Sequence, residues 1–200
     1  VDVYADGGFK ELSSFCNAPM IENYCLNSTA DLYEENGVTR FVGNPTEGAL
    51  LVSAGKCGID YRQKRAAAEI AEVYPFSSDT KNMTTCVKDG DGYAVYTKGS
   101  PEKILALCGL SEAERQALEG EIVGLQKRAR RVLAFAHKNV AACPASREEA
   151  ASAMTFDGLV GLTDPPRAAV AAPLRAFPRA GTALQLPSRD NINPAAAVHH

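Results

Sequence analysis

The sequence predicts an α+β fold in which capped helices accompany an antiparallel β-hairpin. Residues 81–99 (KNMTTCVKDGDGYAVYTKG) have the pattern of two β-strands joined by a turn of Asp and Gly. Segments that begin with helix-capping residues lie before and after this hairpin along the chain. Of the 200 residues, 46% are hydrophobic and 22% are charged, which is typical of a folded domain with a core.

Capping residues mark where the predicted helices begin. In GNPTEGALLVSAG, Asn44 suits the N-cap position, and Glu47 lies three residues later, where a capping box places an acid. Ser111 and Glu114 repeat this pattern at the start of a longer helix after the hairpin. SPEKILALC, directly after the second strand, has a serine cap followed by a proline in the first turn. The hairpin is therefore expected to sit among several helices.

The register of the hairpin decides how two of its lysines lie. With the turn at residues 89–90, Lys81 lies opposite Lys98. With the turn one residue later, the two lysines remain diagonal neighbours on one face. Like charges across a β-ladder are unfavourable, so an anion close to both lysines would explain the arrangement.

The segment YPFSSDTKNM predicts a second part of the same site. The turn-forming residues SSDT separate Phe76 from Lys81 and would let both side chains face one pocket. An aromatic face for a base and a cation for a phosphate fit a nucleotide. The alternative is that Phe76 belongs to the core and Lys81 is a solvated surface charge, and the pattern alone favours this alternative.

Three further groups have both a binding and a structural explanation. Gly99 follows Lys98 at a helix start, where a backbone can approach an anion closely, but a plain strand-to-helix turn explains it equally well. Glu47 could accept a hydrogen bond from an exocyclic amine of a ligand, although the pattern favours its role as a cap. The basic run at 126–131 could contact phosphate or nucleic acid, although a basic helix end that complements the helix dipole is simpler.

Composition and motifs exclude several classes of function. The net charge of −3 gives no basic field for nucleic acid. The sequence has no GxxxxGK[ST] loop, and its one approximate GxGxxG lies within the hairpin. No apolar run is long enough to span a bilayer.

The six cysteines lack CxxC spacing and predict buried thiols in a reducing, cytosolic setting. NST at Asn27 matches a glycosylation sequon without a secretory signal, and His137 is predicted to be a core or boundary residue.

Five segments occur together in an order that resembles one known family. VGNPTEGALL, YPFSSDTKNMT, YTKGSPEKIL, RRVLAFA and VGLTDPPR resemble the nucleotide-binding domain of P-type ATPases, above all the calcium-transporting branch. The resemblance implies an α+β fold with a twisted antiparallel β-sheet flanked by helices, followed by an incomplete dehalogenase-like α/β segment. Because prolines concentrate after about residue 165, the sequence predicts a domain boundary near residue 155. Residues 1–155 are then expected to form the nucleotide-binding domain and residues 156–200 a truncated phosphorylation-domain segment.

The resemblance also implies how ATP, carried with Mg²⁺, is bound. Phe76 would stack on the adenine, and Glu47 would line the adenine side of the pocket. Lys81 and Lys98 would flank the nucleotide. Gly99 would let the nucleotide come close to the backbone, so the ligand would be the anion that the hairpin register requires.

The remaining site residues come from the later segments. Arg131 would reach toward the phosphates, and Asp164 and Arg167, in DPPR, would belong to the phosphorylation domain and close the site. The DKTGT segment with the phosphorylated aspartate of the family is missing from the sequence. The TGDN segment is replaced by SRDN, in which the bulky cation Arg189 takes the place of a glycine that would let the backbone approach phosphate.

The predicted function is that of the ATP-binding cytoplasmic domain of a P-type cation pump, with calcium as the expected ion. This chain alone is expected to be catalytically inactive, because the phosphorylatable aspartate is absent. Its expected partners are the phosphorylation, actuator and membrane domains of a longer pump, with no nucleic acid. The expected location is the cytoplasmic face of a membrane, or the cytoplasm if this chain is expressed alone. The alternatives are a stand-alone ATP-sensing regulatory module and a non-functional pump fragment.

Overall fold

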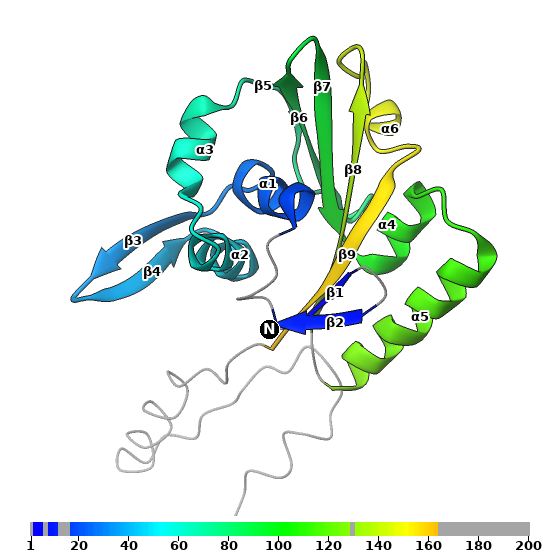
Figure 1. The fold of residues 1–200 in the computed structure, drawn as a ribbon, viewed down its shortest axis with the longest axis horizontal. Coiled ribbons are helices and arrows are strands. Elements are labelled where there is room, and N and C mark those ends of the chain that lie inside the picture. The colour runs from blue at the N-terminus through cyan, green and yellow to red at the C-terminus, as the bar shows by residue number, and fades with distance from the viewer. Residues whose placement is uncertain (1, 6–7, 12–16, 129–130, 164–200) are drawn as a thin grey trace, which may run out of the picture. The chain divides into compact units, whose positions relative to one another are not determined.

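A seven-stranded antiparallel sheet forms the centre of the fold. The computed structural model describes residues 2–5, 8–11, 17–128 and 131–163. Within them, the strands follow the order β2-β1-β9-β8-β7-β6-β5 across the sheet (Figure 1). Their bounds are β1 (Asp2–Ala5), β2 (Gly8–Glu11), β5 (Ile70–Tyr74), β6 (Asn82–Asp89), β7 (Gly92–Gly99), β8 (Arg131–Val140) and β9 (Thr155–Leu162). The predicted α+β fold with an antiparallel sheet is confirmed.

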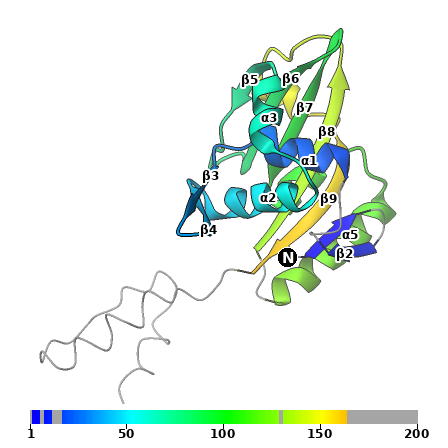
Figure 2. The same ribbon diagram turned by 60° about the vertical axis from the view of Figure 1, so that its left-hand side comes forward.

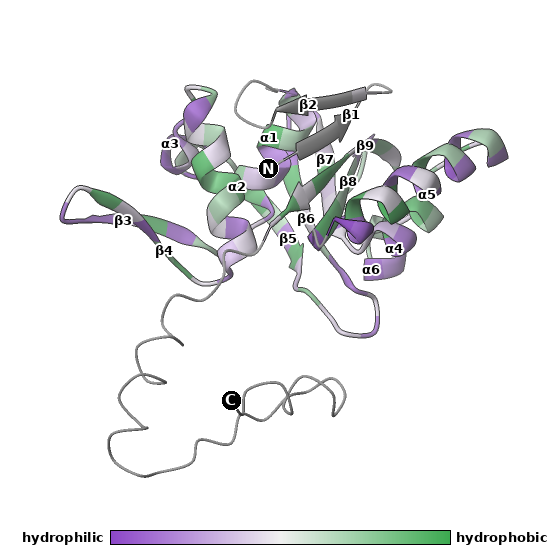
Figure 3. Ribbon diagram, turned by 90° about the horizontal axis from the view of Figure 1, so that it is seen from below, coloured by the Kyte–Doolittle hydropathy of each residue, from purple (hydrophilic) through white to green (hydrophobic). Residues whose placement is uncertain are grey.

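Helices cover both faces of this sheet (Figures 1 and 2). The first three are α1 (Ala18–Leu26), α2 (Pro45–Lys56) and α3 (Tyr61–Ala67), and the others are α4 (Pro101–Leu107), α5 (Glu112–Lys127) and α6 (Arg147–Ala150). Successive side chains of a strand point to opposite faces. In β8, buried Phe135 accordingly belongs to the core under α1–α3, while Ala134 and Ala136 belong to the core under α4–α6. Figure 3 shows the sheet between the two groups of helices.

A second, two-stranded sheet lies beside α2. It consists of β3 (Asp31–Glu35) and β4 (Val38–Val42), joined by a turn in which Asn36 and Gly37 both have positive φ. Phe41 packs against α2, because a Cβ atom added at Gly48 would lie 2.7 Å from the Cβ of Phe41. This hairpin was not predicted from the sequence.

The central hairpin adopts the second of the two predicted registers. Asp89 pairs with Gly92, so the turn lies at residues 90–91. Lys98 consequently pairs with Met83, and Lys81 precedes the first residue of β6. The register that places the two lysines opposite each other is wrong.

The predicted helix starts are confirmed in position, although the side chain of Ser100, at the N-cap of α4, makes no capping hydrogen bond. The Asn44 side chain accepts a hydrogen bond from the backbone N–H of Thr46 at 2.8 Å, as an N-cap does. Ser111 and Glu114 form the predicted capping box. None of the described helices is long and apolar enough to cross a membrane.

The predicted domain boundary lies inside the described sheet. Strand β9 pairs with β1 and β8, so the sheet continues beyond residue 155 to Leu162. The compact unit to which the described residues belong ends at Thr163. Residues 164–200 of the predicted dehalogenase-like segment, with Asp164 and Arg167, lie outside the described residues, and the assignment of the segment stays a prediction.

Candidate functional site

A cavity of about 410 Å³ brings together the described residues that were predicted to form a site. Its walls come from the start of α2, the β5–β6 connection, the end of β7 and the start of β8. The lining residues are Asn44, Thr46, Glu47, Phe76, Ser78, Lys81, Met83, Lys98, Gly99, Ser100, Arg131, Val132 and Leu133. All six described candidates are among them. The other two, Asp164 and Arg167, lie outside the described residues.

Glu47 is buried and does not cap its helix. Its Oε2 atom accepts hydrogen bonds from the backbone N–H groups of Thr29 and Ala30, at 2.9 and 3.1 Å, and from the hydroxyls of Ser28 and Thr29. Its Oε1 atom accepts one from Lys98 at 2.8 Å. The capping role that the local pattern favoured for Glu47 is therefore wrong. A buried carboxylate needs several donors, and the 28–30 segment together with Lys98 supplies them.

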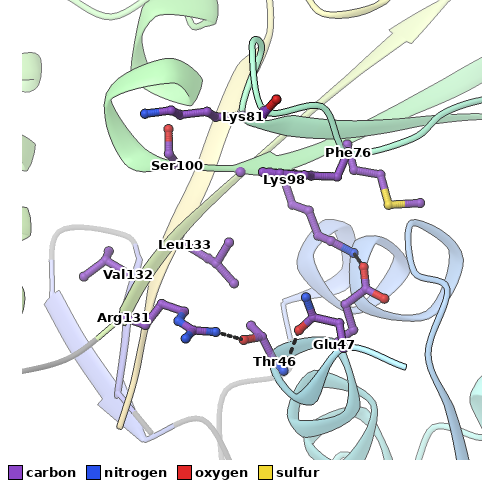
Figure 4. A pocket seen from close by; sticks show the side chains of 13 residues that line it. Thr46, Glu47, Phe76, Lys81, Lys98, Ser100, Arg131, Val132 and Leu133 are labelled. Carbon is purple, nitrogen blue, oxygen red and sulfur yellow. Dashed lines mark hydrogen bonds and ion pairs between the residues drawn. The ribbon is translucent and has the colours of Figure 1, made fainter. Parts of the chain in front are cut away.

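Lys98 forms a buried ion pair with Glu47 (Figure 4). Only 5% of Lys98 is exposed, and its ammonium group also donates to the backbone carbonyl of Asn27. Burial lowers the pKa of Lys98, and the charge of Glu47 opposes this effect. Burial alone would raise the pKa of Glu47, but the charge and hydrogen bond of Lys98 hold it below its ordinary value. The anion that Lys98 requires is thus supplied by the protein itself.

Phe76 and Lys81 lie on the connection between β5 and β6. Phe76 is 63% exposed and lines the cavity, so it is not the core residue that the pattern alone favoured. The connection folds on itself, because the N–H of Lys81 donates to the carbonyl of Ser77 at 2.7 Å. Lys81 has a positive φ of 51° and an exposed side chain, which extends away from Lys98 in Figure 4. Both side chains are available to a ligand.

Gly99 is required by the approach of another backbone segment. A Cβ atom at this position would lie 2.2 Å from the carbonyl oxygen of Lys81 and 2.8 Å from the Cα of Asn82. The next residue, Ser100, donates its N–H to the same carbonyl at 3.0 Å. Lys81 and Asn82 occupy the side of Gly99 on which a Cβ would lie, while Gly99 also lines the cavity. Gly99 thereby sets the position of Lys81.

Arg131 joins the start of β8 to the start of α2. Its guanidinium donates to the hydroxyl of Thr46 at 3.2 Å (Figure 4). Lys81 and Arg131 thus line one cavity together with the exposed ring of Phe76. An aromatic face and cations around one cavity suit a ligand with a flat ring and an anionic group. Among the described residues, no cluster of His, Cys, Asp or Glu could hold a metal ion.

A family model described as "P-type ATPase, cytoplasmic domain N" matches residues 16–169. The chain belongs to this family. Among its relatives are the cation-transporting ATPase pma1 of Synechocystis (34% identical over 78% of this chain) and the probable cation-transporting ATPase F of Mycobacterium tuberculosis (32% over 90%). The calcium-transporting ATPase PAT1 of Dictyostelium discoideum is 30% identical over 94% of this chain. These matches cover 18%, 21% and 18% of the respective relatives, so this chain spans about one fifth of their length.

The N domain also contains a buried polar network that sequence analysis missed. The side-chain amide of Asn27 donates to the carbonyl of Met83 at 2.9 Å, and its oxygen accepts from the hydroxyl of Thr85 at 2.8 Å. Asn23 donates to the carbonyl of Thr97 at 3.0 Å and accepts from Asn27. This network fixes α1 and the 27–30 segment against β6 and β7, and it adjoins the Glu47–Lys98 pair through the carbonyl of Asn27. Asn27 is fully buried, so its sequon signals structure here and not glycosylation.

The cysteines of the N domain only partly match the expected reducing setting. Of the described cysteines, Cys25, Cys86, Cys108 and Cys143 are free thiols, and Cys143 is exposed. Cys57 is disulfide-bonded, which was not predicted.

A histidine–carboxylate pair lies away from the cavity. His137 Nδ1 lies 2.7 Å from Oδ1 of Asp157, which confirms the boundary position predicted for the histidine. Asp157 Oδ2 is buried and has no hydrogen-bond partner among the described residues. Burial raises the pKa of Asp157 to about 6, against the opposing charge and hydrogen bond of His137.

This shift predicts a pH-dependent stability. Because the folded-state pKa of Asp157 lies above its ordinary value near 4, its contribution is present in acid and is lost as pH rises through about 6. Between pH 7 and pH 5, wild type should gain about 1–2 kcal/mol of unfolding free energy relative to Asp157→Asn. Urea unfolding at both pH values measures this, with exposed Glu148→Gln as the control. Equal pH dependence in wild type and Asp157→Asn would contradict the assignment.

Proposed function

We propose that this chain binds ATP, together with Mg²⁺, as the nucleotide-binding domain of a cation-transporting P-type ATPase. The observation that carries the proposal is the convergence of Phe76, Lys81 and Arg131 on one cavity with an exposed aromatic ring. Membership of the N-domain family supports it. The cavity has the size of a small-molecule site.

The adenine end of the proposed site lies at Phe76. A ring that is 63% exposed can stack on a base without rearrangement of the core. Glu47 lines the same cavity, but its carboxylate already accepts five hydrogen bonds from protein groups. A carboxylate has about four lone-pair sites, so contact with the adenine amine would require Glu47 to exchange a partner. The part proposed for the Glu47–Lys98 pair is therefore to form a rigid wall of the pocket.

The phosphate end of the proposed site is basic. Lys81 is exposed and can attract the phosphates from solvent. Arg131, at the start of β8, lies beside the N-terminus of α2. N–H groups at a helix N-terminus favour negative charge. Mg²⁺ would arrive on the nucleotide, since it is usually bound through phosphates and few protein carboxylates. Asp164 and Arg167 remain candidates for nucleotide binding on the family resemblance alone.

The proposed partners are the other domains of a longer pump. A P-type ATPase transfers the γ-phosphate to an aspartate, and the proposed part of this chain is to position ATP for that step. The relatives include proteins named for cation and for calcium transport. We propose that the complete pump transports a cation, with calcium as the first ion to test. The proposed location of this chain is the cytoplasmic face of the membrane.

Calorimetric titration with Mg-ATP tests nucleotide binding, with Phe76→Ala as the decisive variant. The loss of stacking should weaken binding by about 1–3 kcal/mol, or roughly 5- to 150-fold in Kd. Because the ring is largely exposed, the variant should unfold at the same urea concentration as wild type. Val73→Ala, on β5 outside the cavity lining and 37% exposed, is the matched control and should bind as wild type does.

Two results would contradict the proposal. Absence of saturable heat from folded wild-type protein would exclude ATP binding by this chain. Unchanged affinity in Phe76→Ala would exclude this residue as the adenine platform, and Lys81→Met would then test whether the phosphates bind in the cavity at all.

A further inference from the structure

Two free thiols, Cys86 and Cys143, lie in contact outside the lining of the cavity. Cys86, on β6, is fully buried in the core under α4–α6, and Cys143 lies in the exposed loop after β8. The thiol of Cys143 points to the sulfur of Cys86, and the two sulfur atoms are 3.6 Å apart. The other free thiols of the described chain, Cys25 and Cys108, are buried.

We propose that Cys143 and Cys86 are a redox-active pair that closes to a disulfide with hydrogen peroxide as the oxidant. The sulfur of Cys143, as thiolate, attacks one peroxide oxygen, the O–O bond breaks, and a sulfenic acid forms while the leaving hydroxide takes a proton to become water. The sulfur of Cys86 then attacks the Cys143 sulfur and displaces the hydroxyl, which leaves as water with the Cys86 proton. Two thiols lose two electrons, and one peroxide becomes two water molecules.

The environments of the two sulfurs assign the order of these steps. Cys143 is exposed and meets the oxidant first. Burial raises the pKa of Cys86 to about 12, with a further contribution from its contact with Cys143, so Cys86 remains a thiol and is shielded from direct oxidation. Cys86 reacts only with a sulfur already beside it. Bond formation brings the sulfurs from 3.6 Å to about 2.0 Å. The exposed neighbours Ala142 and Ala145 leave the Cys143 loop room for this shift.

The disulfide would also restrain the connection that carries Phe76 and Lys81. Arg147 follows Cys143 by four residues, and its guanidinium donates to the carbonyl of Pro75 at 2.6 Å and to the hydroxyl of Thr80 at 3.3 Å. The hydroxyl of Tyr74 also reaches the carbonyl of Pro144 at 3.5 Å. The segment from Cys143 to Arg147 therefore lies against both ends of the connection, and a covalent bond at Cys143 fixes it to β6.

Peptide mapping of the full chain tests the covalent bond. Trypsin separates residues 82–88 from residues 139–147, and each peptide contains one cysteine of the pair. The protein is exposed to one equivalent of hydrogen peroxide, and its remaining thiols are alkylated. The two peptides should then appear linked, with a mass two hydrogen atoms below the sum of the two thiol peptides, and reduction should release them. Cys143→Ser, at an exposed position, should abolish the link, while Cys108→Ser should leave it unchanged.

The proposed bond would be overturned if wild type gave no linked peptide and Cys143 were either unreacted or oxidised to sulfinic or sulfonic acid.

Hydrogen exchange then tests whether the disulfide restrains the β5–β6 connection. Amides of residues 77–81 should exchange several-fold more slowly in the oxidised protein, and Arg147→Ala should remove this difference while the link still forms. Equal exchange in both redox states of wild type would overturn the restraint. Neither readout involves nucleotide, so the outcome is independent of the proposed ATP site.

Discussion

Replacing Lys98 with methionine is expected to lower the free energy of unfolding by about 3–5 kcal/mol. The substitution keeps most of the side-chain volume but leaves the carboxylate of Glu47 buried without its counter-charge. It also leaves the carbonyl of Asn27 without the ammonium donor. Urea unfolding of wild type and variant at pH 7 measures the loss.

A matched substitution separates this effect from the general loss of a lysine. Lys81→Met changes the same charge at an exposed position and should alter stability by less than about 0.5 kcal/mol. Because Lys98 holds the pKa of Glu47 down, the deficit of Lys98→Met should shrink as pH falls and Glu47 is protonated. A deficit below about 1 kcal/mol at pH 7 would show that the pair is not the buried interaction described.

Gly99→Ala is expected to cost about 2–3 kcal/mol of unfolding free energy. The added Cβ meets backbone atoms of Lys81 and Asn82, which cannot move aside as the end of a flexible side chain can. The start of β6 must shift, and the hydrogen bond from Ser100 to the Lys81 carbonyl lengthens. The displacement should also weaken ATP binding at the proposed site, because Lys81 moves with it.

Gly109→Ala is the control for this substitution. No atom lies within 4 Å of a Cβ at Gly109, so the change should be neutral or slightly stabilising. Thermal or urea unfolding of both variants measures the contrast. If Gly99→Ala were as stable as Gly109→Ala, the tight approach of β6 to position 99 would be disproved.

Local signals in the sequence predicted most of the elements around the site. Asn44 and Ser111 were identified as helix caps because a capping residue and its partner lie within three positions of each other. The hairpin was identified from its Asp and Gly turn, but this turn allows two registers. The choice between them depends on packing of the whole sheet, which a local pattern does not contain.

The errors concern partners that are distant in the sequence. The capping pattern at Glu47 is satisfied locally, yet its carboxylate pairs with Lys98, 51 positions away. Asn27 appeared only as a sequon, although its amide joins strands far along the chain. The turn of Asn36 and Gly37 is a typical hairpin signal, but both strands around it are mostly exposed and lack the alternation that marks a half-buried strand.

The connectivity of the cavity walls has a consequence for local opening. Strands β5 to β9 follow one another along the sheet in the order of the chain, so each pairs with its sequence neighbour. The opposite wall, at α2, is held by contacts that span 51 residues at Glu47 and 85 residues at Thr46. A fluctuation that detaches α2 would remove the α2 wall of the pocket while the meander of strands stays paired. We infer that a ligand in this cavity acts as a clamp between two separately cooperative parts of the N domain, and stabilises the docking of α2 more than the sheet itself.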